Sequence, residues 1–173
     1  MRFRRKSVEG PSQQPPATIS SQYFQLGALR LYQPESILQE RLLSGVAELG
    51  AYCKALAWVG EEYFGQLGQD FGSMGVLIVV GIRPSKRTRL WCDQVDGDIP
   101  PDVWQVFVEL FEGAGQDVLP TVSGPVACAL ECLLGSGPSA DFPIGPNAWQ
   151  QAARSAGRDL SIPDDLFEVV FPG

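Results

Sequence analysis

A nearly unbroken apolar run over residues 76–82 is the feature that most constrains the fold of this chain. Most of its residues are β-branched, and such a run is typical of a strand that is buried on both faces. Residues 83–86 supply a turn, and residues 88–95 alternate well enough to form the returning strand. The two segments therefore predict a β-hairpin.

Helical spacing of apolar residues marks four other segments. Residues 34–63 carry an amphipathic stripe that begins with a proline, and two internal glycines leave one long helix and two shorter ones as alternatives. Residues 124–134 are apolar nearly all round and predict a buried helix, and residues 148–156 predict a shorter one. The clearest helix begins at Pro100–Pro101 and ends at Gly113. Its apolar stripe consists of Val103, Trp104, Phe107, Leu110 and Phe111.

The remaining segments are shorter. Residues 23–32 are expected to form a first strand and residues 118–122 another, whereas residues 163–171 fit a short helix or a short strand. Residues 135–147 are rich in glycine and proline and predict a long loop. Strands and helices are interspersed without the regular order of βαβ units. We therefore expect a single α+β domain over residues 21–173, with a small, mainly antiparallel sheet packed with three to five helices.

Charge is distributed unevenly along the chain. It has 13 Lys and Arg residues against 20 Asp and Glu, which gives a net charge of -7. Residues 1–10 hold four of the cations and one glutamate, so nine basic and nineteen acidic residues remain, with a net charge of -10. Such an acidic body disfavours general nucleic-acid binding and suits a basic partner.

The basic start is followed by a proline-rich polar stretch instead of an apolar one, so residues 1–20 are interpreted as a flexible basic and polar tail. No apolar run approaches the length of a membrane span. We expect a cytoplasmic protein, and a mature periplasmic chain that has lost its signal is the alternative.

The absence of histidine restricts the chemistry of the chain. It excludes Ser-His-Asp and Cys-His catalysis and His-ligated zinc within this chain. The four cysteines form no CxxC pair, and we expect them to pack in the core, with Cys128 and Cys132 on one face of a helix. No catalytic residue, metal site or cofactor is predicted. The cysteines are Cys53, Cys92, Cys128 and Cys132.

The most distinctive local pattern is a block of four cations followed by a block of four acids. Trp91 lies between them, and Arg and Trp are favoured at binding hot spots. The pattern predicts a partner-recognition surface on the hairpin; a solvated hairpin whose charges pair with each other or protect a sheet edge is the alternative. The acids lack the spacing of a calcium loop. The predicted site residues are Arg83, Lys86, Arg87, Arg89, Trp91, Asp93, Asp96 and Asp98, and Asp102 completes the acidic block.

These observations lead to a functional hypothesis. We expect a non-enzymatic protein-binding module, such as a small acidic inhibitor, an immunity-type protein or an adaptor, which acts by surface complementarity on a protein with a basic surface. The first alternative is a small-ligand-binding or enzymatic α+β domain that uses carboxylates or a cysteine. The second is a structural subunit of an assembly. The sequence makes no prediction of the oligomeric state.

Overall fold

The computed structural model describes residues 23–136, 140–161 and 163–173, and the expected tail over residues 1–20 lies outside these ranges. The strands are β1 (Phe24–Leu31), β2 (Met74–Arg83), β3 (Arg87–Val95) and β4 (Val126–Leu134). They form one antiparallel sheet in the order β1-β4-β2-β3. The helices are α1 (Glu35–Arg41), α2 (Val46–Leu67), α3 (Pro101–Gly113), the short 3-10 helix η1 (Gln116–Val118), α4 (Asn147–Ala156) and α5 (Pro163–Val170).

Strand β2 lies in the interior of the sheet, and all ten of its residues are buried. It pairs with β3 on one side and with β4 on the other, so that Val79 is opposite both Trp91 and Ala129. The predicted hairpin is therefore confirmed, and so is the α+β class with a small antiparallel sheet and five α-helices in the described ranges.

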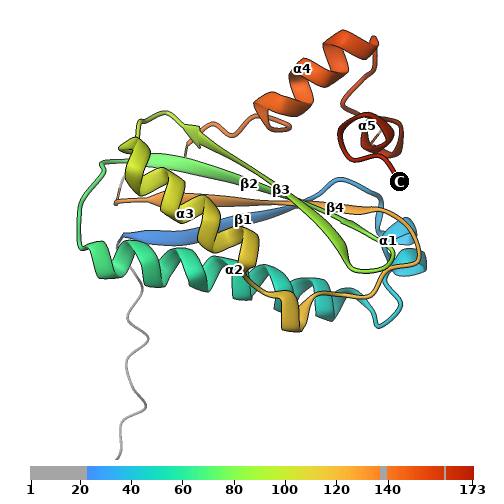
Figure 1. Cartoon of the computed structure of the whole chain (residues 1–173), viewed down its shortest axis with the longest axis horizontal. Coiled ribbons are helices and arrows are strands. Elements are labelled where there is room, and N and C mark those ends of the chain that lie inside the picture. Colours follow the sequence, from blue (N-terminus) through green and yellow to red (C-terminus); the bar gives the residue numbers. More distant parts are fainter. Residues whose placement is uncertain (1–22, 137–139, 162) are drawn as a thin grey trace, which may run out of the picture.

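Helices cover both faces of this sheet, with α2 and α3 on one side and α4 and α5 on the other (Figure 1). Alternate residues of a strand point to opposite faces. Val76, Ile78, Val80 and Ile82 accordingly belong to the core beneath α2 and α3, together with a cluster of aromatic rings around Phe107. Leu77 and Val79 belong to a second core with Trp149 and Phe167. None of the helices within the described ranges is long and apolar enough to cross a membrane.

Two predicted elements are wrong. Residues 126–134 form strand β4 and not a helix. A largely apolar segment fits a strand buried on both faces as well as a buried helix. Here the segment pairs with β1 on one side and with β2 on the other, and this pairing makes it a strand. Residues 118–122 do not form a strand: η1 ends at Val118, and Val122 makes only an isolated bridge to Leu42.

The amphipathic stripe over residues 34–63 forms two helices, α1 and α2, which is one of the two alternatives left open. Gly45 separates them and has a φ of 91°, in the left-handed region that favours glycine. The C-terminal segment forms a helix, α5. Cys128 and Cys132 do share one face, but of strand β4.

We expect Gly60→Ala to destabilise the protein and Gly65→Ala, in the same helix, to stabilise it. A Cβ atom at Gly60 would lie 2.3 Å from Cε1 of the buried Phe24 ring, whereas a Cβ at Gly65 would meet nothing within 4 Å. Overpacking of this kind costs about 1–3 kcal/mol. Ala in place of an exposed helical Gly contributes up to about 1 kcal/mol. Urea unfolding followed by circular dichroism measures both, and equal effects of the two variants would contradict the packing described.

Candidate functional site

All three predicted hairpin arginines bind residues at the C-terminal end of the chain. Arg83 is buried; its Nε donates to the carbonyl of Phe171 (2.6 Å), and an Nη donates to Glu168 (2.9 Å). Arg89 donates to the carbonyl of Val170 (2.7 Å). Arg87 donates to the carbonyl of Pro172 (3.2 Å). Cations are favourable at the carboxyl end of a helix, so these arginines stabilise α5 where it ends.

Trp91 packs in the core between the sheet and α4. Its side chain is 8% exposed, and its ring meets that of Trp149 edge-on with centroids 5.2 Å apart. The guanidinium of Arg89 lies 5.3 Å from the centre of the Trp91 ring. Trp91 is therefore a structural contact that attaches α4 to β3.

In the acidic half of the predicted site, one residue has a contact within the chain and two are exposed. A carboxylate oxygen of Asp93 accepts a hydrogen bond from the backbone N–H of Asn147 (2.6 Å), at the start of α4, where a negative charge is favourable. Asp96 has a φ of 58° at the end of β3, and both it and Asp98 are exposed. Lys86 is exposed at the hairpin turn. The structure thus gives five of the eight predicted residues contacts within the chain, and partner binding by the hairpin stays a prediction.

We expect Arg83→Gln to loosen α5, whereas Lys86→Gln should have no effect. The first change removes buried hydrogen bonds from a charged group, each worth about 1.5–3 kcal/mol, which corresponds to roughly 10- to 100-fold faster amide exchange. Hydrogen–deuterium exchange of residues 163–171 measures this, with α2 as the internal reference. Unchanged exchange in the Arg83 variant would contradict the anchoring role.

Three of the four cysteines are buried, and Cys92 is half-buried. Cys53, Cys128 and Cys132 are buried in the core beneath α2, and the Sγ atoms of Cys53 and Cys128 are 3.7 Å apart. Burial raises the pKa of Cys92 to about 12 and also raises the pKa of Cys132. The hydrogen bond with Cys53, together with burial, raises the pKa of Cys128. A protonated, buried thiol is a poor nucleophile, so this arrangement argues against cysteine-based catalysis.

The raised pKa values predict a pH effect on stability. Thiols in the unfolded chain lose their protons above roughly pH 8.5, whereas Cys92, Cys128 and Cys132 keep theirs in the folded chain because their pKa values are raised. The unfolded state therefore binds fewer protons, and the free energy of unfolding should fall as the pH rises from about 8.5 towards 11. Urea unfolding at several pH values measures this. Ellman's reagent at about pH 8 should react with Cys53, Cys128 and Cys132 only after unfolding, and rapid reaction of these three in the folded protein would contradict their burial.

Glu131 is the carboxylate of the sheet interior that an enzymatic function could use. Glu131 is ion-paired with Arg30. Arg30 also donates to the carbonyls of Pro143 (2.7 Å) and Ile144 (3.1 Å), so this pair fastens a loop over the sheet. Among the residues that the structure describes, no group of three or more Cys, Asp or Glu side chains is placed to hold a metal ion.

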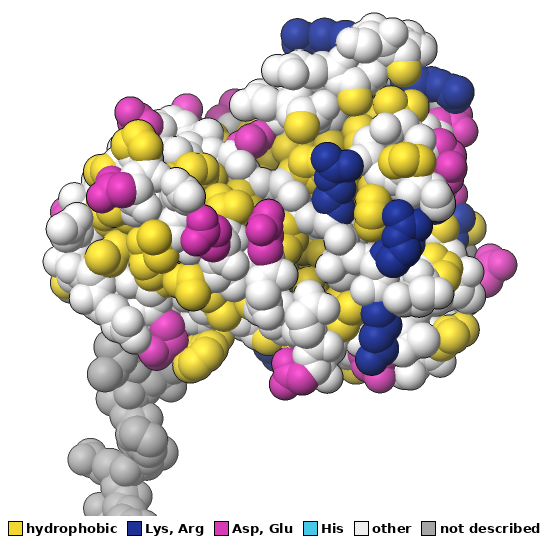
Figure 2. All heavy atoms as spheres, in the orientation of Figure 1, with side chains coloured by type: hydrophobic (Ala, Val, Ile, Leu, Met, Phe, Trp, Pro, Cys, Tyr) yellow, Lys and Arg dark blue, Asp and Glu magenta, His cyan; other side chains and the backbone are white. Residues whose placement is uncertain are grey.

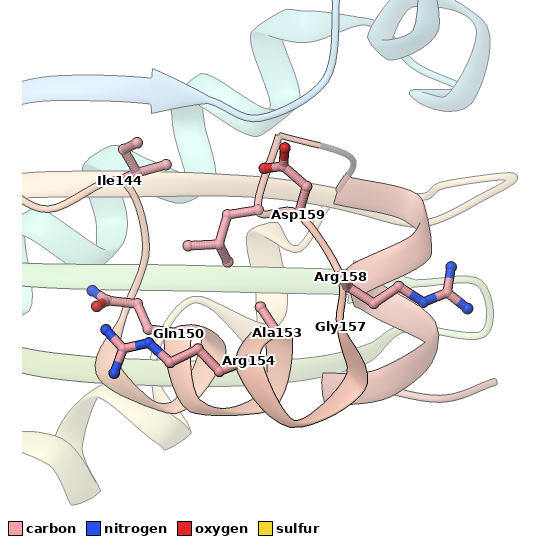
Figure 3. Close-up of a pocket in the computed structure, with 8 residues that line it drawn as sticks. Ile144, Gln150, Ala153, Arg154, Gly157, Arg158 and Asp159 are labelled. Atoms are coloured by element: carbon pink, nitrogen blue, oxygen red, sulfur yellow. The ribbon is translucent and has the colours of Figure 1, made fainter.

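An open depression of about 500 Å³ lies beside the carboxyl end of α4 (Figure 3). Arg154 and Arg158 line it, but their side chains point in opposite directions. Arg158 pairs with Asp165 (3.2 Å). The end of a helix carries partial negative charge, which opposes the binding of an anion there. The depression is therefore a poor candidate for an anion or small-ligand site.

A groove between α2 and α3 has the features of a protein-binding site. It has a volume of about 310 Å³, and Trp58, which is 60% exposed, lies along it with Leu110, which is 44% exposed. The hydroxyl of Tyr63 donates to the carbonyl of Val103 (2.9 Å) and ties the two helices together. Val106, on α3, is 45% exposed. We call this the α2–α3 groove; it is lined by Trp58, Val59, Glu62, Tyr63, Gln66 and Leu110.

The surroundings of the α2–α3 groove are acidic. Helices α2, α3 and η1 contain seven carboxylates and one cation, Lys54. Figure 2 shows hydrophobic and acidic side chains interspersed over one half of the molecule, whereas the cations gather on the other half. The carboxylates are Glu48, Glu61, Glu62, Asp102, Glu109, Glu112 and Asp117.

Sequence reasoning missed this groove, although a signal was present. Trp58 falls outside the apolar stripe that defines the buried face of α2, so its exposure followed from the helical period. Leu110 belongs to the predicted apolar stripe of α3, but its side chain is 44% exposed and lines the groove.

Comparisons of the chain with protein-family models, with curated proteins and with solved structures gave no match.

Proposed function

We propose that this protein is a non-enzymatic binding module that takes a basic surface of another protein into the α2–α3 groove. The observation that carries the proposal is Trp58: a large aromatic side chain is 60% exposed on α2, and helices α2, α3 and η1 together contain seven carboxylates and one lysine. Aromatic residues in such positions are frequent anchors of protein interfaces.

The charge around the groove defines the kind of partner. Carboxylates attract Lys and Arg side chains over distances of several ångströms and accelerate encounter with a basic protein. They repel the phosphates of nucleic acids, which take up positive charge. A protein surface that has Lys and Arg residues around an apolar side chain would place the apolar group beside Trp58 and its cations beside Glu62 and Glu109.

The surface available is larger than the groove alone. Ala51 and Trp58 are seven residues apart on α2 and so lie on one helix face. A second, smaller depression lined by Ala51, Glu48 and Val118 therefore continues the α2–α3 groove towards η1. A continuous surface of this kind is needed because a specific interface covers about 800 Å² on each partner.

The proposed mechanism is masking. Acidic side chains steer the partner, Trp58 then anchors it, and the covered basic surface is no longer available to other molecules. An inhibitor, an immunity-type protein or an adaptor would act in this way. The buried, protonated thiols and the engaged Glu131 favour this proposal over the enzymatic alternative.

The test begins with capture of partners from lysate at low salt and stepwise salt elution, followed by affinity measurements with the purified partner. Trp58→Ala should weaken the complex at least about 30-fold, since truncation of an anchor costs about 2 kcal/mol or more. Charge reversal in the double variant Glu62→Lys with Glu109→Lys should slow association and weaken its salt dependence.

Lys86→Ala is the matched control, because Lys86 is exposed at the hairpin turn, where the sequence predicted the site. It should bind like the parent protein. A partner lost by Lys86→Ala and retained by Trp58→Ala would move the site to the hairpin. A partner without a basic surface would contradict the proposed masking function.

A further inference from the structure

The two edges of the sheet differ in how they are protected. On β3, the arginines at positions 87 and 89 supply charge and hold the C-terminal residues alongside. Among the described residues, β1 pairs only with β4, and five of its eight residues are exposed. Within the described residues, β1 from Ala28 to Leu31 is therefore an open edge, the kind of surface on which a further strand can pair.

The backbone of β1 offers hydrogen-bonding groups on this open side. The N–H of Tyr32 donates to the carbonyl of Ala127, its opposite residue on β4 (3.3 Å). Because the backbone groups of successive residues in an antiparallel ladder point alternately inwards and outwards, those of Leu29 and Leu31 are directed away from β4. Two residues with outward backbone groups thus lie beyond the irregularity between Leu26 and Ala28.

The side chains of β1 do not oppose pairing. Leu29 and Leu31 are 41% and 42% exposed, and the two residues before Leu29 are the small Gly27 and Ala28. Arg30 is the only charged residue of β1, and it is already bound to Glu131 and to two loop carbonyls. The strand contains neither the lysine nor the proline that usually protects a sheet edge. The irregularity at Gly27 is the feature of β1 that limits how far a further strand could pair along it.

We propose that β1 pairs in antiparallel orientation with β1 of a second copy of this chain, so that two four-stranded sheets join into one sheet of eight strands. A register centred on Leu29 places the two Leu29 backbones opposite each other and each Arg30 opposite Ala28 of the second copy. The arginines then do not face each other, and Leu31 lies opposite Gly27, where no side chain obstructs it. A second copy suits this edge because a two-fold pairing matches the exposed Leu29 and Leu31 with the same strand and leaves each Arg30 bound to Glu131 of its own chain.

This inference is independent of the proposed function, because it uses the sheet edge and leaves the α2–α3 groove open. A dimer would present two such grooves and could hold a partner that carries two basic sites with increased avidity. A single strand pair is a small interface, so we expect dissociation in the roughly micromolar range.

Sedimentation velocity over about 1–200 μM protein tests the proposal. The parent chain should shift from the mass of one chain to that of two as concentration rises, and Leu29→Lys should remain monomeric at the highest concentration. Val106→Lys, which places the same charge at an exposed apolar residue of α3, should dimerise like the parent chain. Circular dichroism and urea unfolding establish that each variant is folded. A monomeric parent chain, or a Leu29→Lys variant that still dimerises, would overturn the proposal.

A cysteine variant tests the register without disturbing the edge. Opposed residues of a hydrogen-bonded antiparallel pair have Cα atoms about 5.5 Å apart, a separation that a disulfide spans. Leu29→Cys should therefore form a cross-linked dimer on mild oxidation, faster than Leu43→Cys, whose position is 62% exposed but away from β1. Equal rates for both variants would contradict the register. Partner binding by Trp58→Ala is measured separately, so failure of either proposal leaves the other intact.

Discussion

Burial of β2 on both faces is the constraint on which the rest of the structure depends. A strand whose ten residues are all buried needs a neighbouring strand on each side for its backbone hydrogen bonds and a layer of side chains on each face. Strands β3 and β4 meet the first requirement, and the two helix layers meet the second. The remaining elements of the described chain pack against β2 directly or against an element that does.

The two helix layers are held by different forces. Beneath α2 and α3, large aromatic rings pack in a continuous cluster, and Gly60 is needed so that α2 can approach the Phe24 ring. On the other face, α5 is short and is held by arginines from distant segments. Arg41 donates two hydrogen bonds to Asp164 (2.8 and 2.6 Å), at its start, and Arg83 binds Glu168 and Phe171, at its end. The charge-assisted bonds give α5 a fixed position that its small apolar area alone would not.

The sequence predicted those elements whose local pattern has one physical interpretation. The hairpin followed from a β-branched run and a turn, and α3 followed from two prolines, an apolar stripe and a glycine. Strand β4 could not be predicted because nine largely apolar residues contain no period, and the choice between helix and strand is made by β1 and β2, which are distant in sequence.

The same distinction applies to the candidate site. The cluster of charge on the hairpin was visible in the sequence, but the partners of Arg83 and Arg89 lie more than 80 residues away and can be found only in the fold. Asp93 likewise finds its partner at the start of α4, 54 residues on. Trp58 is the converse case, because its position off the apolar stripe of α2 was evident from the helical period alone.

Engagement of the hairpin arginines within the chain has a consequence for the surface as a whole. Hydrogen bonds to backbone carbonyls hold Arg87 and Arg89 against the C-terminal residues, but both arginines are exposed and keep their charge. Helices α2, α3 and η1, in contrast, contain seven carboxylates and one cation. We therefore propose that a basic partner is attracted first to the helix pair α2 and α3. Trp58 lies in the groove between these two helices, so the proposed anchor is on the surface to which the partner would be attracted. The excess of carboxylates in these helices and the exposed Trp58 together favour the α2–α3 groove over the hairpin as the proposed binding surface.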